Sequence, residues 1–233
     1  LSAIAPELAR AGLDRVNISL DSLDPENFRD VTRGGRLDRC LAGIDTARRH
    51  FRPVKINSVL LRGFNAPAEL ERFLEFSDAS GLEVRFIELM PLFDAKEYFH
   101  RHFFSVEEAI DALRARGHEL VPEGDGAAEG NTTGYGPATT FRVAGTRARL
   151  GFISQMSNTK CLSCNKLRLT SDGALKPCLL SPQEQDLSTP IRRRDRQAVA
   201  QAMRTHFLER AERYDALQAL HGPLGRGMQS IGG

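Results

Sequence analysis

The sequence has no tryptophan and no run of apolar residues long enough to cross a bilayer. Its start also lacks the basic and then apolar pattern of a secretory signal, so we expect a cytoplasmic protein. The 32 basic and 30 acidic residues leave a formal net charge of only +2, which gives no electrostatic case for a protein dedicated to binding nucleic acid or a membrane surface. With 41% hydrophobic residues among 233, the chain can bury a sizeable core.

Cysteine is scarce, and the four cysteines are too few for a disulfide scaffold. Three of them, Cys161, Cys164 and Cys178, lie in one segment, which in a reducing compartment indicates a metal site. The fourth, Cys40, stands apart in a helical stretch beside Leu41. We interpret Cys40 as a small buried residue of the core.

The spacing of the three clustered cysteines suits one metal centre. Cys161-x2-Cys164 forms a tight loop, and Cys178 returns after a segment long enough to double back. Structural zinc sites normally have four protein ligands, whereas His118 and His206, the nearest histidines, lie well outside this segment. Three thiolates with a vacant fourth position suit a [4Fe–4S] cluster with one open iron. Zinc remains an alternative, because such clusters more often have four cysteines.

Residues 1–90 alternate short apolar strand patterns with longer amphipathic helical ones, which predicts a parallel α/β arrangement. The expected helices cover residues 1–11, 37–50 and 68–79, and the expected strands cover residues 15–20, 54–61 and 82–89. Three strands are too few for a closed barrel, and the chain opens within a helix. We therefore expect a truncated chain.

The alternation ends after Pro91. Ser105 and Glu108 predict a capping box for a helix that ends near Arg116. Ser171-Asp172-Gly173 predicts the turn of a hairpin. The remaining expectations are a loop at 123–137, strands at 140–143 and 149–153, hairpin strands at 167–170 and 174–177, a helix at 195–213 and a glycine-rich tail.

Several ordered motifs resemble the C-terminal part of the GTP 3′,8-cyclases, which are radical S-adenosylmethionine enzymes. The resemblance covers nearly the whole chain. It rests on Val16–Asp21 (VNISLD), Thr32–Gly35 (TRGG), Val54–Asn57 (VKIN), Arg85–Pro91 (RFIELMP), Gly151–Ser154 (GFIS), Cys161–Thr170 (CLSCNKLRLT), Asp172-Gly173, Lys176–Leu179 (KPCL) and the terminal Gly-Gly.

The resemblance implies an α/β fold in two parts. Residues 1–104 would be the C-terminal half of an incomplete (βα)6 radical-SAM barrel, and residues 105–233 a smaller domain that binds a [4Fe–4S] cluster and GTP. Family members hold a first [4Fe–4S] cluster on a Cys-x3-Cys-x2-Cys loop, which is absent from this sequence. The resemblance therefore implies that the chain on its own is inactive.

The resemblance also implies the roles of particular residues. They are Ser19 and Met90 for S-adenosylmethionine, Lys55, Lys166, Leu167 and Arg168 for GTP, Cys161, Cys164 and Cys178 for the cluster, and Gly232 and Gly233 for a tail that inserts into the active site.

The residue pattern agrees with these roles in part. Asn17 and Ser19 share one face of their strand, as do Lys55 and Asn57, and polar residues at the C-terminal ends of barrel strands usually serve the active site. Lys166 and Arg168 would likewise share one face of a hairpin strand and attract an anion such as a phosphate.

Two features depart from the family pattern. Lys166 stands where the family usually has arginine, so the charge is kept but the bidentate fork is lost. The stretch 92–104 is longer and more aromatic than in the family. We interpret its His100 and His102 as surface loop residues, with a role as ligands or acid–base groups as the alternative.

The implied activity is that of a lyase that converts GTP to 3′,8-cyclo-7,8-dihydro-GTP in the first step of molybdenum cofactor biosynthesis. The implied partners are a reductant protein, a second copy of the chain in a homodimer, and the downstream cyclic pyranopterin monophosphate synthase, with no nucleic acid or membrane. Two alternatives remain: a radical enzyme with an auxiliary cluster that modifies a peptide, and a non-enzymatic zinc-binding module.

Overall fold

The computed structural model describes residues 1–91, 96–123, 138–157, 167–179 and 183–212. The chain divides into a first unit, Leu1–Leu89 with Arg101–Asn158, and a second unit, Met90–His100 with Thr159–Gly233. Residues 105–158 thus belong to the same unit as the predicted barrel part, and the predicted division into two functional domains after residue 104 stays a prediction.

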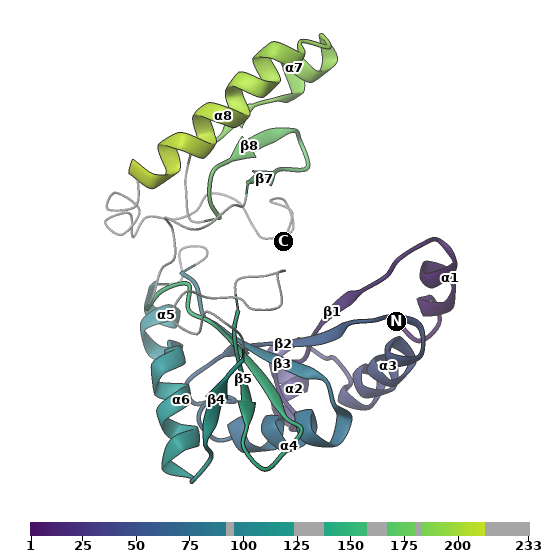
Figure 1. Cartoon of the computed structure of the whole chain (residues 1–233), viewed down its shortest axis with the longest axis vertical. Helices are drawn as coiled ribbons and strands as arrows, with labels where there is room; N and C mark the ends of the chain where they lie inside the picture. Colours follow the sequence, from purple (N-terminus) through teal and green to yellow (C-terminus); the bar gives the residue numbers. More distant parts are fainter. Residues whose placement is uncertain (92–95, 124–137, 158–166, 180–182, 213–233) are drawn as a thin grey trace. The chain divides into compact units, whose positions relative to one another are not determined.

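The first unit contains a six-stranded mixed sheet with the order β1-β2-β3-β6-β5-β4 (Figure 1). Four neighbouring strands are parallel: β1 (Val16–Ser19), β2 (Val54–Leu60), β3 (Glu83–Glu88) and β6 (Arg149–Ile153). The antiparallel strands β5 (Thr139–Val143) and β4 (Leu120–Pro122) complete the sheet. The predicted parallel α/β arrangement is confirmed, and the strand predicted at 149–153, which is β6, joins the first three as a fourth parallel strand.

Helices α1 (Ala5–Arg10), α2 (Pro25–Val31), α3 (Leu37–His50), α4 (Leu70–Ser80) and α6 (Val106–Ala115) belong to the first unit. The predicted capping box is present at α6, where the Ser105 hydroxyl accepts from Glu108 N (3.1 Å) and the Glu108 carboxylate accepts from Ser105 N (2.9 Å). Helix α2 was not predicted, although Asp24 caps it and Pro25 begins it.

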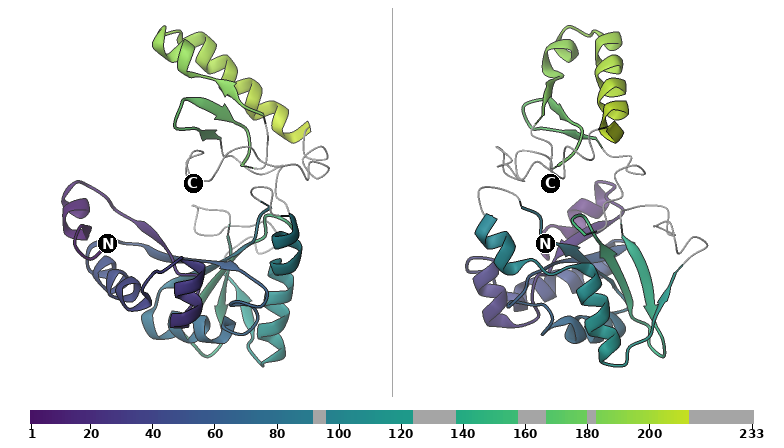
Figure 2. Two further views of the ribbon diagram at one scale, coloured as in Figure 1. Left: turned by 180° about the vertical axis from the view of Figure 1, so that it is seen from behind. Right: turned by 90° about the vertical axis from the view of Figure 1, so that its left-hand side faces the viewer.

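Helices cover one face of the parallel strands (Figure 2). The side chains on that face are apolar, and those on the opposite face are more polar. On the apolar face, the ring of Phe86 lies 5.7 Å from that of Phe73 on α4 and 5.7 Å from that of Phe152 on β6. Side chains alternate across a strand, so Glu83, Arg85 and Ile87 point to the opposite face from Phe86. The core therefore leaves the other face of the parallel strands for polar residues.

The second unit contains a three-stranded antiparallel sheet, formed by β7 (Arg168–Leu169), β8 (Ala174–Lys176) and β9 (Gln185–Asp186), and the helices α7 (Ser188–Arg192) and α8 (Arg196–Glu212). Leu175, Leu187 and Ala202 form its small core. The predicted hairpin is confirmed, and Gly173 takes φ +86°, which suits glycine at its turn. Strand β9 and helix α7 were not predicted.

The interpretation of His100 and His102 as loop residues is wrong, because both lie in helix α5 (Lys96–His102). His102 Nδ1 lies 2.9 Å from the carbonyl oxygen of Arg62, and Arg62 N donates to the carbonyl oxygen of His102 at 2.8 Å. This reciprocal pair orders the end of the helix. Most of the predicted loop at 123–137 lies outside the described residues.

Within the ranges that the structure describes, no helix combines the length and the apolar character needed to span a membrane.

Candidate functional site

The non-helical face of the parallel strands carries two rows of mainly polar side chains. The strand register sets Asn17 beside Lys55 and Lys55 beside Glu83 in one row. It sets Ser19 beside Asn57 and Asn57 beside Arg85 in the next. Ser19 and Lys55 therefore lie on adjacent strands with their side chains on the same face of the sheet.

Glu83 joins two cations on this face. Its Oε2 lies 3.3 Å from Nζ of Lys55, and its Oε1 lies 2.5 Å from Nε of Arg85. The side chains of Lys55, Glu83 and Arg85 are only 13%, 5% and 8% exposed, so their charges interact more strongly than they would in water. Because one carboxylate serves two cations, the three side chains carry a net positive charge, which suits an anionic ligand.

The pKa of Glu83 records the same balance. Burial raises it, but the hydrogen bond from Arg85 and the charges of Arg85 and Lys55 together outweigh burial, and the pKa is lowered. Glu83 therefore stays ionised at neutral pH and holds both cations in place.

Gly151 on β6 makes room for this cluster. It is the register partner of Arg85, and a Cβ at this position would lie 3.0 Å from Cγ of Arg85 and 3.5 Å from Oε1 of Glu83. Glycine thus admits the close approach of the Arg85 side chain. In the same row, Asn57 Oδ1 is buried and has no hydrogen-bond partner among the described residues, so it can accept from a ligand donor.

The ends of β1 and β2 are held together beyond the polar rows. Asn65 Nδ2 donates to the carbonyl oxygens of Asp21 (2.6 Å) and Val59 (2.8 Å), while its Oδ1 accepts from Leu61 N (2.9 Å). The carboxylate of Asp21 accepts from Val59 N at 2.9 Å. Burial raises the pKa of Asp21, and the hydrogen bond from Val59 offsets only part of that rise. These contacts fix the C-terminal ends of β1 and β2, and Ser19 is the last residue of β1.

In the second unit, Arg168 on β7 is the register partner of Lys176 on β8. Lys176 is 2% exposed, and its Nζ lies 3.2 Å from Oε1 of Glu184. Leu167 packs against the small core, so its side chain is directed to the protein interior. Cys178 follows β8, is partly buried and is not in a disulfide.

The predicted site residues fall into three groups. Ser19 and Lys55 lie on the polar face of the first unit. Leu167, Arg168 and Cys178 lie in the second unit, as does the partly buried Met90. Cys161, Cys164, Lys166, Gly232 and Gly233 lie outside the described residues.

No group of three or more His, Cys, Asp or Glu side chains in the described part of the chain is arranged to hold a metal ion. Two of the three predicted ligands, Cys161 and Cys164, lie outside that part. The predicted cluster site therefore stays a prediction.

Sequence reasoning missed Glu83, Arg85 and Lys176. A signal was present for the first two: in Glu83–Glu88 (EVRFIE), charged residues at positions 83 and 85 flank an apolar one, which places both charges on one face of a strand.

Comparisons with known proteins agree with the motifs. The model of the Radical SAM superfamily matches residues 2–77, and that of Molybdenum Cofactor Synthesis C matches residues 82–216. The GTP 3′,8-cyclase of Alkaliphilus oremlandii is 38% identical over 100% of this chain and 69% of its own length. That of Hydrogenovibrio crunogenus is 37% identical over 98% of this chain and 68% of its own length, and that of Heliobacterium modesticaldum is 43% identical over 83% and 57%. The chain belongs to the GTP 3′,8-cyclase family, whose members are radical SAM enzymes of molybdenum cofactor biosynthesis.

Proposed function

We propose that this chain forms the part of a GTP 3′,8-cyclase that binds GTP and a substrate-facing cluster. The enzyme converts GTP to 3′,8-cyclo-7,8-dihydro-GTP in the first step of molybdenum cofactor biosynthesis. The observation that carries this proposal is the net positive, largely buried cluster of Lys55, Glu83 and Arg85, on the same polar face of a radical-SAM sheet as Ser19.

The proposed architecture has two parts. Residues 1–104 contribute to an incomplete (βα)6 barrel, with the polar face of the sheet as its interior. Three of the four parallel strands, β1, β2 and β3, lie in this range with helices against one face, which supports this assignment. Residues 105–233 include the domain that holds the cluster. Ser19 and Met90 bind S-adenosylmethionine, and Ser19 is exposed on the polar face as that role requires.

Lys55 binds the triphosphate of GTP, together with Lys166, the backbone of Leu167, and Arg168. Lys55 is suited to this task because Glu83 holds its ammonium group in one position while Arg85 supplies a compensating positive charge. A cation fixed before the ligand arrives loses less side-chain entropy on binding. Charge-assisted hydrogen bonds to phosphate then hold one end of the substrate.

Cys161, Cys164 and Cys178 hold a [4Fe–4S] cluster. Three thiolates suit this cluster, and the Cys178 thiol is partly buried and unbridged, as a ligand must be. When bound, S-adenosylmethionine and a first cluster supply the radical chemistry at C3′ of GTP, and the cluster held here supplies an open iron for the guanine base. The first cluster would need cysteines beyond the four in residues 1–233.

The chain's own residues orient the substrate. Holding the triphosphate at one end and the base at the other restricts rotation about the ribose, so that C3′ stays close to C8 of guanine. Proximity of this kind can lower a barrier by several kcal/mol. The product passes to cyclic pyranopterin monophosphate synthase, a reductant protein supplies electrons, and the enzyme forms a homodimer.

The test uses the anaerobically purified enzyme in which this chain follows a Cys-x3-Cys-x2-Cys segment, with that first cluster removed by mutation. We expect iron and acid-labile sulfide, and a directly coupled nitrogen signal in the electron–nuclear double resonance spectrum of the reduced cluster when ¹⁵N-guanine GTP is added. Stoichiometric colourless zinc would instead support the zinc-binding module. GTP binding that leaves the cluster spectrum unchanged would refute the substrate role of the open iron.

A further inference from the structure

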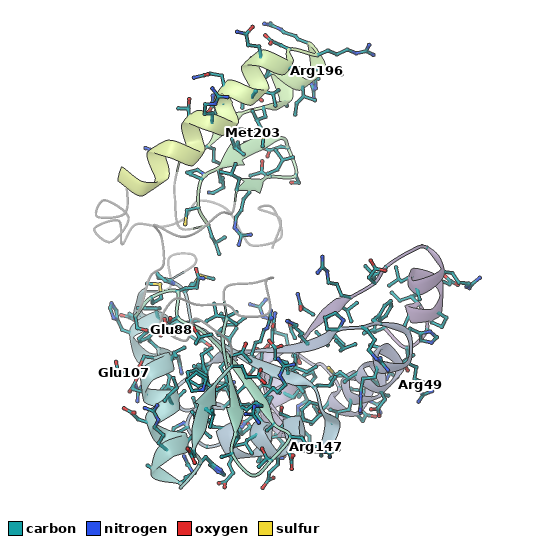
Figure 3. All side chains as sticks on the ribbon, viewed as in Figure 1. Arg49, Glu88, Glu107, Arg147, Arg196 and Met203 are labelled. Atoms are coloured by element: carbon teal, nitrogen blue, oxygen red, sulfur yellow. The ribbon has the colours of Figure 1, made fainter. Side chains whose placement is uncertain are left out.

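Glu88, which is labelled in Figure 3, is the last residue of β3. Its buried carboxylate accepts four hydrogen bonds. Its Oε1 accepts from Val106 N at 2.9 Å and from the hydroxyl of Ser157. Its Oε2 accepts from Met156 N at 2.8 Å and from Ser157 N at 2.9 Å. At 1% exposure, this carboxylate has exchanged its hydration for these four donors.

The four donors lie in two segments, at the start of α6 and directly after β6. The start of α6 already has its own capping box from Ser105 and Glu108, so Glu88 supplements an existing cap there. The segment after β6 is different, because three of the four hydrogen bonds come from Met156 and Ser157. Glu88 is the acceptor for both of their backbone N–H groups.

Glu88 and Ser157 both lie next to points at which the chain passes from the first unit to the second. Glu88 is followed by Leu89, after which the chain enters the second unit at Met90. Ser157 is followed by Asn158, after which the chain enters the second unit again and reaches Cys161. One carboxylate therefore joins the two points at which the chain leaves the first unit. Met90, proposed to bind S-adenosylmethionine, follows the first point, and Cys161, proposed to bind the cluster, follows the second.

We infer that Glu88 is a positioning residue, which fixes the start of the cysteine-bearing segment against the strand that leads to Met90. This inference rests on the proposed function. Glu88 contacts neither substrate nor cluster in this role. It sets where the cluster ligands begin, so that the guanine base and the triphosphate are held at the correct separation.

The substitution Glu88→Gln tests this role, because Gln has nearly the same shape. A carboxylate accepts at both oxygens, whereas an amide replaces one oxygen with an NH2 donor. Toward Met156 N and Ser157 N, that NH2 group would face two donors. Toward Val106 N and the Ser157 hydroxyl, it could keep only the hydroxyl as an acceptor. Glu88→Gln thus loses at least the hydrogen bond from Val106 N. Its neutral amide oxygen is also a weaker acceptor for Met156 N and Ser157 N than the carboxylate, so the hold on this segment weakens without loss of side-chain volume.

The matched control is Glu108→Gln. Glu108 also supports the start of α6, but it is 42% exposed in its side chain and contacts Ser105 and Arg62. It therefore reproduces the effect of a weaker helix start. Both variants are made in the complete enzyme with both clusters reconstituted, and iron, 5′-deoxyadenosine and cyclised product are measured together.

For Glu88→Gln we expect the full iron content and 5′-deoxyadenosine release near that of the wild type. Cyclised product per 5′-deoxyadenosine should fall by roughly 10–100-fold, the scale of a misplacement of about 1 Å in a reacting site. Hydrogen exchange at the amides of Met156 and Ser157 should become faster, which is a readout independent of activity. Glu108→Gln should keep the wild-type ratio and exchange rates.

The inference is overturned if Glu88→Gln has the same product ratio as Glu108→Gln while the wild type is active. A wild-type enzyme that makes no cyclised product would instead overturn the proposed function. Should Glu88→Gln fail to fold, Ser157→Ala removes only the hydroxyl donor, and we expect a lower product ratio with normal iron. A wild-type ratio in Ser157→Ala would then overturn the inference.

Discussion

Lys55 forms an ion pair with Glu83, its register partner on the neighbouring strand β3, with Nζ 3.3 Å from Oε2. The pair lies on the polar face of the sheet, and Glu83 also binds Arg85 two residues further along the same strand. Lys55, which we propose binds the triphosphate of the substrate, is therefore part of a charge network that is already formed before the substrate binds.

We predict that Glu83→Gln lowers the free energy of unfolding by about 3 kcal/mol at pH 7, since it leaves two largely buried cations without their carboxylate. The folded-state pKa of Glu83 is lowered from 4.5, so its contribution is present above pH 4.5 and is lost as the pH falls through the folded-state pKa. Urea unfolding at several pH values should show the difference from wild type shrinking below pH 4.5.

Glu108→Gln is the control for that series, since the pKa of Glu108 is also lowered but its side chain is 42% exposed. Its effect at pH 7 should stay within about 1 kcal/mol. Equal effects of the two substitutions would contradict a special role for the Glu83 network.

The cation itself is tested by Lys55→Ala in the complete enzyme. We expect the Kd for GTP to rise by roughly 10–100-fold, the loss of about 1.5–3 kcal/mol in a charge-assisted contact, with little change in the Kd for S-adenosylmethionine. Arg49→Ala removes the same charge from an exposed position on α3 and should leave GTP binding unchanged (Figure 3). Isothermal titration measures both ligands, and equal Kd values for GTP in the two variants would remove Lys55 from the substrate site.

The sequence predicted those strands and helices that bury one face in the core, because burial of one face gives them a periodic pattern of apolar residues. Strand β2 alternates because Val54 and Ile56 enter the core while Lys55 does not, and helix α3 was expected at 37–50, as found. Helix α7 has five residues and strand β9 has two, which is too short for a period to show.

The sequence predicted individual residues of the candidate site but not the contacts between them. Sequence placed Lys55 at a strand position suited to a ligand, but its partner Glu83 depends on the register between two strands. Glu88 was recognised only as part of a motif, because its contacts to Met156 and Ser157 span 68 and 69 residues. Both the Lys55–Glu83 ion pair and the contacts of Glu88 depend on tertiary structure, which a local sequence pattern does not reveal.

A third prediction concerns the contacts that hold the ends of β1 and β2. Asn65→Asp has nearly the same shape but replaces the amide donor that serves the carbonyl oxygens of Asp21 and Val59. Because Asn65 is only 3% exposed, the new carboxylate oxygen would face the carbonyl oxygens of Asp21 and Val59 with little access to water. We expect the free energy of unfolding to fall by about 2–4 kcal/mol. Gln201→Glu makes the same chemical change at an exposed position on α8 and should cost under about 0.5 kcal/mol in urea unfolding. A similar cost at both positions would contradict the network.

The tail gives a fourth prediction. Gly232 and Gly233 lie outside the described residues, and by resemblance they insert into the active site, where glycine permits close backbone approach. Replacing both with alanine in the complete enzyme should abolish the cyclised product. The Kd for GTP should stay within about 3-fold of the wild-type value, so the change in binding free energy should be less than about 1.4 kcal/mol, the value for a tenfold change. Ser230→Ala, in the same tail, should keep product formation. Normal turnover in the double variant would show that the tail has no catalytic role.

The last prediction separates the two kinds of cysteine in the chain. Cys178 follows β8, is partly buried and is a proposed cluster ligand, whereas Cys40 on α3 packs against the core and its Sγ lies 3.8 Å from the carbonyl oxygen of Ser19. Burial raises the pKa of the Cys40 thiol, which keeps it protonated and unsuited to bind iron. Cys178→Ala should therefore lose the cluster held by this chain, with its iron, sulfide and GTP-sensitive resonance signal, because two thiolates hold such a cluster poorly. Cys40→Ala should keep all three and change only stability, by about 1 kcal/mol. Iron retained at the wild-type level in Cys178→Ala would remove this residue from the ligand set, and the cluster assignment would then need a different third ligand.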